Sequence, residues 1–284
     1  MSTPLRRRLQ GWGLMAPALA WTLAFFVVPL AIMAVYSLWQ RIDGQLDKSV
    51  TLTNYQTFFE RSYFSEALVN SLEISVITVI ISILLAYPLA YILAYRVPPR
   101  WQRIALVLAI LPFWTSYLVR SYSWLLILSG GGIISQSLIW LGLTDDAVSF
   151  ANSRGATILG FVHFFTMLLT LTIFANLVQI SPSYRKAAAD LGASRLQVLL
   201  RVTLPLSLPG VMVGAFLTFV LAIGDYVTPQ ILGGGQELVM PQAIMLQVQR
   251  SADFPLASAM SIILMFVVTI AFFGSARWLK MDRV

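Results

Sequence analysis

Long apolar stretches dominate the pattern of hydrophobic and polar positions along this chain. A helix needs roughly 20 apolar residues to cross a hydrocarbon core. Six stretches are long enough: about Trp12–Leu38, Ala67–Tyr95, Ile104–Leu128, Ala156–Val178, Pro209–Leu232 and Pro255–Leu279. The pattern therefore predicts an all-α integral membrane protein with about six transmembrane helices.

Composition supports this fold class. Of the 284 residues, 58% are hydrophobic and 11% are charged, whereas about a quarter of the residues in a soluble domain are charged. The absence of cysteine excludes disulfides, thiolate metal sites and a cysteine nucleophile. The net charge of +7 could indicate a nucleic-acid partner, but in so apolar a chain an uneven distribution of Lys and Arg across a bilayer explains it better.

The first apolar stretch follows three arginines, Arg6 to Arg8, so a cleaved signal peptide has to be considered. The apolar region of a signal peptide is about 7–15 residues long. This stretch continues beyond Ala20 to Val35. We therefore expect an uncleaved membrane anchor.

The basic residues predict the orientation. With the N-terminus in the cytoplasm, 13 of the 19 Lys and Arg residues lie in internal segments and Arg120 lies within a span. The other five lie in external segments: Arg41, Lys48, Arg61, Arg154 and Arg250. Because internal loops are enriched in Lys and Arg, we expect a multi-pass protein of the bacterial inner membrane with both termini cytoplasmic.

The predicted internal segment Gln179–Leu208 is long and has a helical pattern. Ser183 is suited to begin a helix, and three alanines follow at 187–189. Gly192 permits a turn with positive φ. A second amphipathic stretch begins at Ser194, and Pro205 and Pro209 are expected to end it. We predict a short helix–turn–helix against which another protein docks.

This segment resembles the EAA loop of binding-protein-dependent ABC importer permeases. The family pattern consists of Glu-Ala-Ala, a glycine, and a closing aliphatic-x-Leu-Pro, and here Lys186 replaces the usual glutamate. The resemblance implies that the segment couples to an ATPase. The coupling residues would be Ala187, Ala188, Asp190, Gly192, Ala193, Leu204 and Pro205.

Two further segments, Leu111–Trp124 and Ala222–Gly235, look like the spermidine/putrescine-type branch of these permeases. The likeness implies the type I importer permease (MetI-like) fold. It also implies three regions: 1–66, with the N-terminal tail, first helix and external loop; 67–279, the permease domain with its coupling loop at 179–208; and a short tail at 280–284.

The resemblance also implies the partners: a second and different permease, two copies of a cytoplasmic ATPase, and an extracytoplasmic solute-binding protein. ATP and Mg would bind to the ATPase, and this chain would bind no cofactor, in keeping with its lack of a phosphate-binding G-x-x-x-x-G-K-[ST] loop. Polyamines are the leading substrate. The fourth helix lacks the aromatic-Pro pattern of the branch. A different small organic solute therefore stays open as an alternative substrate.

Ionisable residues within a membrane span are functional candidates. Glu73, Arg120, His163 and Asp225 all fall in the outer third of their predicted spans and could form one polar ring. Asp225 is expected to continue a small-residue stripe of Gly210, Gly214, Thr218 and Ala222. Asp225 would either meet a cationic substrate or form a structural pair with Arg120. Glu73 is open to the same two interpretations, contact with a substrate or structural pairing. His163 is better explained as a hydrogen-bonded packing residue.

The candidate substrate path therefore comprises both acids, Arg120 and aromatic side chains that could stack on a cation: Asp225, Tyr226, Glu73, Arg120, Trp114 and Tyr117.

Two other functional classes stay open. An ion-gradient-driven secondary transporter would be favoured by inverted repeats or broken helices, and the sequence shows neither clearly. A membrane enzyme or an assembly scaffold is disfavoured, because there is no G-x-S-x-G motif and no metal-ligand spacing around the single histidine. We expect a transport subunit, not an enzyme.

Overall fold

The computed structural model describes residues 14–235 and 237–279. Six helices in this part are long and apolar enough to cross a membrane: Leu14–Ser37, Ser62–Tyr95, Tyr117–Trp140, Arg154–Gln179, Arg195–Ile223 and Phe254–Ser275. The helical membrane fold is therefore confirmed. Arg6 to Arg8, Trp12 of the first predicted span and the tail at 280–284 lie outside the described residues.

The chain divides into two compact units. The first combines the chain up to Phe64 with Ile244–Phe266, and the second combines Ser65–Ala243 with the chain from Val267 onward.

The first unit contains the N-terminal span, followed by a β-hairpin and a short helix. The span includes η1 (Leu23–Val27) and α2 (Val28–Ser37); β1 (Gln40–Ile42) and β2 (Gln45–Asp47) form an antiparallel hairpin, and α3 (Thr53–Glu60) follows. The Asn54 side chain donates hydrogen bonds to the carbonyls of Ser37, at 3.0 Å, and Trp39, at 2.6 Å. These bonds fix α3 to the end of α2. The unit also holds the end of α13 (Met240–Gln249) and the start of α14 (Phe254–Leu279).

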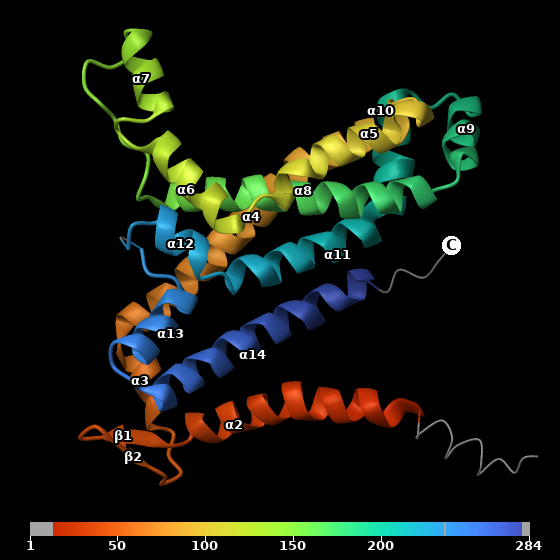
Figure 1. The fold of residues 1–284 in the computed structure, drawn as a ribbon. Coiled ribbons are helices and arrows are strands. Elements are labelled where there is room, and N and C mark those ends of the chain that lie inside the picture. Colours follow the sequence, from red (N-terminus) through yellow and green to blue (C-terminus); the bar gives the residue numbers. More distant parts are fainter. Residues whose placement is uncertain (1–13, 236, 280–284) are drawn as a thin grey trace, which may run out of the picture. The chain divides into compact units, whose positions relative to one another are not determined.

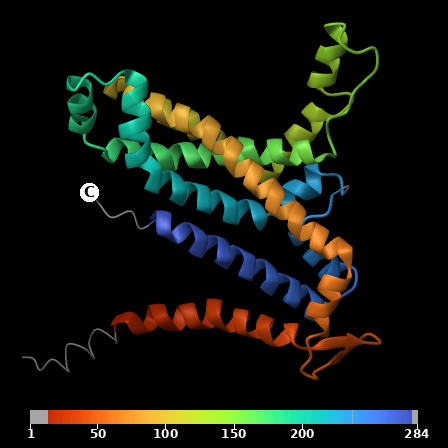
Figure 2. The same cartoon turned by 180° about the vertical axis from the view of Figure 1, so that it is seen from behind.

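The second unit is built on α4 (Ser62–Tyr95), α8 (Arg154–Gln179) and α11 (Leu204–Ile223). Helices α8 and α11 run side by side in opposite directions (Figure 1), and α4 crosses them (Figure 2). One buried cluster of aliphatic side chains packs these helices together: Ala86, Ala90, Leu169, Ile173, Leu177 and Val211.

Glycines let α8 and α11 approach closely. A Cβ added to Gly210 would fall 2.7 Å from the amide nitrogen of Asn176, and one added to Gly214 would fall 2.9 Å from Leu169 Cδ2. Thr218 and Ala222 on the same stripe are buried. The small-residue stripe therefore packs against protein, as predicted.

Replacing Gly210 with valine is expected to destabilise the folded chain by about 1–3 kcal/mol, because the new side chain overpacks the α8–α11 contact. Thermal unfolding of the purified chain in detergent measures this change. Gly274→Val is the matched control, since the same substitution on α14 meets nothing within 4 Å. Equal melting temperatures for the two variants would contradict the close packing.

The third predicted span, Ile104–Leu128, is not one helix, which corrects the prediction. It consists of α5 (Pro99–Ile110), a 3-10 turn η2 (Leu111–Trp114) and α6 (Tyr117–Leu128). Pro112 has no N–H to continue the helical ladder, and the Thr115 hydroxyl donates to the Pro112 carbonyl at 2.7 Å. A short helix, α7 (Ile133–Trp140), follows the glycines at 130–132.

The segment between α8 and α11 forms the predicted helix–turn–helix. Helix α9 (Pro182–Asp190) is capped by Ser181, not by Ser183 as expected, and Gly192 turns the chain with φ +85°. Helix α10 (Arg195–Val198) begins with a capping box between Ser194 and Gln197. We call α9, α10 and their connecting turn the coupling corner, after the role that the resemblance implies.

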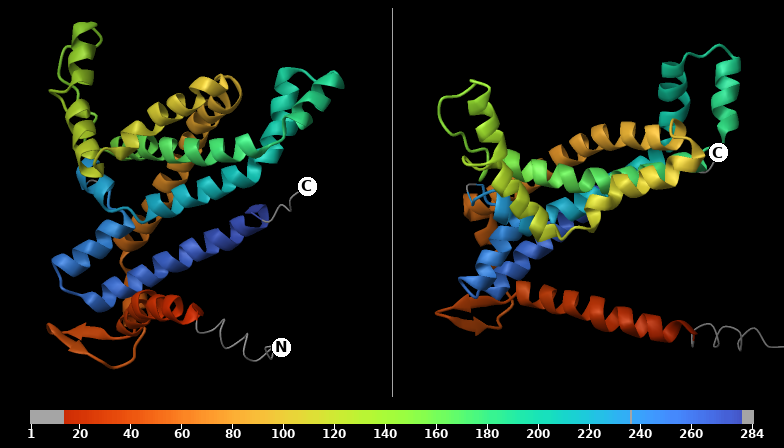
Figure 3. Two further views of the ribbon diagram at one scale, coloured as in Figure 1. Left: turned by 45° about the vertical axis from the view of Figure 1, so that its right-hand side comes forward. Right: turned by 45° about the horizontal axis from the view of Figure 1, so that its top comes forward.

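Pro205 and Pro209 do not end the helix that begins at Arg195, which corrects a second prediction. A π-helical turn, η3 (Leu199–Thr203), leads directly into α11, and both prolines lie within α11. The coupling corner is therefore continuous with a membrane span. Figure 3 shows the corner at one end of the α8–α11 pair and α6 and α7 at the other.

Candidate functional site

Asp225 lies in the link that joins two helices of the second unit. Helix α11 ends at Ile223, and α12 (Val227–Leu232) begins two residues after Asp225. Asp225 Oδ1 accepts a hydrogen bond from the backbone N–H of Val227 at 2.8 Å, and Oδ2 accepts one from Thr228 at 3.4 Å. The expected continuous span Pro209–Leu232 is thus broken, and the Asp225 carboxylate accepts the first two backbone N–H groups of α12 instead of extending the small-residue stripe.

The side chain of Tyr117, at the start of α6, reaches this link. Its hydroxyl donates to Asp225 Oδ2 and also contacts the hydroxyl of Thr228. Thr228 is buried and Asp225 is half-buried. The sequence singled out both Tyr117 and Asp225, and the fold brings them together across a separation of 108 residues.

Arg120 is buried, with 7% of its surface exposed. Its guanidinium lies over the rings of Tyr117, at 5.6 Å, and Phe164, at 4.6 Å, and donates to the Pro112 carbonyl at 3.4 Å. The Asp225–Arg120 ion pair, one of the two interpretations of Asp225, is not formed, since the salt bridges in the described part of the chain all involve Arg154. Aromatic faces stabilise this cation.

His163 is a hydrogen-bonded packing residue, as expected. The indole N–H of Trp124 donates to His163 Nδ1 at 3.0 Å, and the two rings meet edge to face. No hydrogen bond or ion pair between described residues directly joins Glu73, Arg120, His163 and Asp225 to one another. The single polar ring is therefore not formed: Arg120 and Asp225 both contact Tyr117, whereas His163 and Glu73 make separate local contacts.

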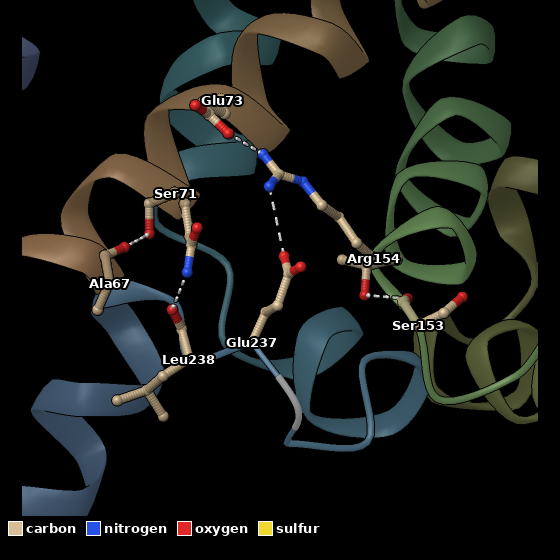
Figure 4. Close-up of polar contacts among 9 residues, drawn as sticks. Ala67, Ser71, Glu73, Ser153, Arg154, Glu237 and Leu238 are labelled. Atoms are coloured by element: carbon tan, nitrogen blue, oxygen red, sulfur yellow. Dashed lines mark hydrogen bonds and ion pairs between the residues drawn. The ribbon is translucent and has the colours of Figure 1, made fainter. Parts of the chain in front are cut away.

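Glu73 pairs with Arg154, the first residue of α8 (Figure 4). The second Arg154 nitrogen lies 3.5 Å from a carboxylate oxygen of Glu237, in the segment between α12 and α13. We call these three residues the arginine clasp. The side chains of Arg154, Glu73 and Glu237 are 28%, 53% and 42% exposed. Such exposed pairs each stabilise by about 1 kcal/mol or less.

The arginine clasp was not predicted. From the sequence, Arg154 is predicted only to be one of the external basic residues. One signal was available: an arginine in the first turn of a helix opposes the helix dipole, so Arg154 directly after the capping residue Ser153 indicates that it has an acidic partner elsewhere.

Two aromatic candidates remain, Trp114 and Tyr226. Among the described residues, neither forms a hydrogen bond with the Asp225 side chain. Trp114 is 84% exposed and, with Ile110, Phe113, Met167 and Leu168, lines an apolar cavity of about 300 Å³. Tyr226 is half-buried beside Asp225 at the start of α12.

The predicted coupling residues fall in two places. Five of them gather at the coupling corner: Ala187, Ala188, Asp190, Gly192 and Ala193. Next to Gly192, the apolar side chain of Leu191 is 89% exposed. Leu204 and Pro205 lie apart from the corner, at the start of α11.

Comparison with known proteins gives a consistent picture. The family described as "Binding-protein-dependent transport system inner membrane component" matches residues 86–281. The spermidine/putrescine transport system permease protein PotB of Escherichia coli is 30% identical over 249 residues, which cover 87% of this chain and 90% of that protein. PotB of Haemophilus influenzae is 30% identical over 255 residues, covering 89% and 88%.

Two solved structures share the fold. A chain of a bacterial ABC transporter that imports the acidic polysaccharide alginate aligns with a TM-score of 0.76 at 19% identity, over 98% of both chains. A chain of the MetNI methionine ABC transporter aligns with a TM-score of 0.58 at 15% identity, over 76% of this chain and 95% of that one.

Proposed function

The chain belongs to the family of inner-membrane components of binding-protein-dependent transport systems, and on that premise we propose that it forms half of the translocation pathway of an ATP-driven importer for polyamines or a related small organic solute. The family is one of transport permeases, not of enzymes. The observation that carries the substrate class is the similarity to spermidine/putrescine permeases across nearly the whole chain.

The runner-up class, an ion-gradient-driven secondary transporter, is not favoured. The broken helix at η2 is a feature that such transporters share. Family membership and the fold shared with ABC importer chains outweigh this one feature.

In the proposed assembly, this chain pairs with a second, different permease. Two cytoplasmic ATPase subunits hold ATP and Mg, and an external binding protein delivers the solute. Both termini lie in the cytoplasm. The coupling corner docks on an ATPase and acts as a lever, and its continuity with α11 supports this role because a continuous helix transmits force without a joint.

The proposed substrate path runs past Asp225. Asp225 is the group that would meet an ammonium group, with Tyr117 holding its carboxylate and Tyr226 beside it. Trp114, on η2, and Arg120, on α6, flank Tyr117 in the sequence. Glu73 is a second acidic candidate, and Arg154 already neutralises part of its charge.

Proteoliposomes containing the complete transporter, with external binding protein and internal ATP, are expected to accumulate radiolabelled spermidine or putrescine. Omitting ATP should abolish uptake, whereas collapsing ion gradients with an uncoupler should leave it largely intact. Loss of uptake on adding the uncoupler, with ATP present, would instead indicate a secondary transporter. ATP-driven uptake of a different solute, with polyamines unable to compete, would overturn only the substrate.

A further inference from the structure

A polar cavity of about 260 Å³ lies between the end of α4 and the coupling corner. Its polar wall consists of Tyr91, Tyr95, Arg96, Arg185 and Arg195. The remaining lining side chains are small or apolar, and among the residues that the structure describes no carboxylate lines the cavity. Because the described salt bridges involve only Arg154 as the base, none of these three arginines has an ion-pair partner in the part of the chain that the structure describes.

Arg185 is held in place at this cavity by an aromatic ring. Its guanidinium carbon lies 3.5 Å from the ring centroid of Tyr95, and the Tyr95 hydroxyl donates to the Leu177 carbonyl of α8 at 2.8 Å. The Nε atom of Arg185 is buried and has no hydrogen-bond partner among the described residues. Arg185 as a whole is only half-buried, so an anion supplied from outside the chain would bind at the more exposed donors of its guanidinium group and not at Nε.

We propose that this cavity binds a phosphate group through Arg96, Arg185 and Arg195. The guanidinium group presents a planar fork of donors that matches phosphate oxygens in pairs. Three guanidinium groups surround one cavity that no described carboxylate lines. This arrangement favours an anion with several oxygen atoms over a single chloride ion. Since one water occupies about 30 Å³ of liquid, the volume accommodates a phosphodiester and several waters.

The headgroup of an anionic phospholipid is the favoured source of this phosphate. The cavity lies where α4 ends as a membrane span, and tyrosines such as Tyr91 and Tyr95 are enriched at headgroup level. Basic pockets at the cytoplasmic ends of spans are known binding sites for such headgroups. A bound headgroup would tie the coupling corner to α4, and so would make coupling depend on lipid composition.

Calorimetric titration of the purified full-length chain in detergent tests this site. The probes are short-chain phosphatidylglycerol, short-chain phosphatidylcholine and inorganic phosphate. We expect phosphatidylglycerol to bind more tightly than phosphatidylcholine, and Arg96→Gln combined with Arg195→Gln to weaken its binding by about tenfold or more. This double variant removes two exposed guanidinium groups and leaves the Arg185–Tyr95 contact untouched.

Arg103→Gln is the matched control, because Arg103 is an exposed base on α5 that does not line the cavity. If phosphatidylglycerol binds to the unaltered chain and to Arg103→Gln but not to the double variant, the cavity is a headgroup site. Binding of inorganic phosphate alone, lost in the same variant, supports the site with a soluble phosphate compound as ligand. Absence of binding by either probe, or equal weakening by Arg103→Gln, overturns the proposal. None of these outcomes depends on the transported solute.

Discussion

Gly192→Val is expected to lower uptake by about tenfold or more while the associated ATPase continues to hydrolyse ATP. Gly192 has φ +85°, in the left-handed region, where a residue with a Cβ is strained by about 1–2 kcal/mol. A free-energy change of about 1.4 kcal/mol shifts an equilibrium tenfold. A Cβ at this position would meet nothing within 4 Å, so the effect arises from the backbone and not from a clash.

The number of ATP molecules hydrolysed per solute imported is the decisive measurement for this variant. We expect that ratio to rise, because a corner with a different turn would no longer transmit ATPase closure to α11. Gly192→Asn should retain uptake, since asparagine tolerates the left-handed region far better than valine does.

Gly142→Val is a matched control for this experiment. Gly142 has φ +66° and likewise nothing within 4 Å of an added Cβ, but it follows α7, at the other end of the second unit. An unchanged ratio is expected. Normal uptake by Gly192→Val, or an equal rise in the ratio for both valine variants, would refute the lever model.

The sequence predicted those features of the fold that depend on length and composition. The spans follow from hydrophobic runs, and the turn at Gly192 follows from a glycine between two helical patterns. Hydropathy does not resolve local backbone geometry. The breaks at Pro112 and Gly224 lie inside apolar runs, where a 3-10 turn or a helix end leaves the hydrophobicity unchanged.

At Pro205 and Pro209 the error was the opposite one: a helix end was predicted where the helix continues. Proline was expected to end a helix, but a π-helical turn precedes Pro205 and the helix continues. Contacts between distant residues were the hardest part of the site to predict. Arg154 pairs with Glu73 across 81 residues, and no periodicity or local motif specifies such a partner.

For Asp225→Asn we expect a loss of about tenfold or more in polyamine uptake, with the transporter complex still assembled. Asparagine and aspartate are equally good helix caps, so the amide oxygen can still accept the Val227 N–H that Asp225 accepts at 2.8 Å. The substitution removes the negative charge, and a hydrogen bond to a charged group contributes about 1.5–3 kcal/mol. Uptake as a function of spermidine concentration, together with co-purification of the partner subunits, measures both effects.

Asp253→Asn is the matched control for the removal of a capping carboxylate. Asp253 Oδ1 accepts the backbone N–H of Leu256 at 3.1 Å near the start of α14, so the same chemical change removes a carboxylate that accepts a backbone N–H at the start of a helix. Because Tyr117 donates to Asp225, Tyr117→Phe separates the remaining possibilities. If Asp225→Asn impairs uptake and Tyr117→Phe does so only weakly, the carboxylate itself meets the cation. If Tyr117→Phe abolishes uptake and Asp225→Asn is neutral, or if assembly fails in Asp225→Asn, then Asp225 only holds the link between α11 and α12.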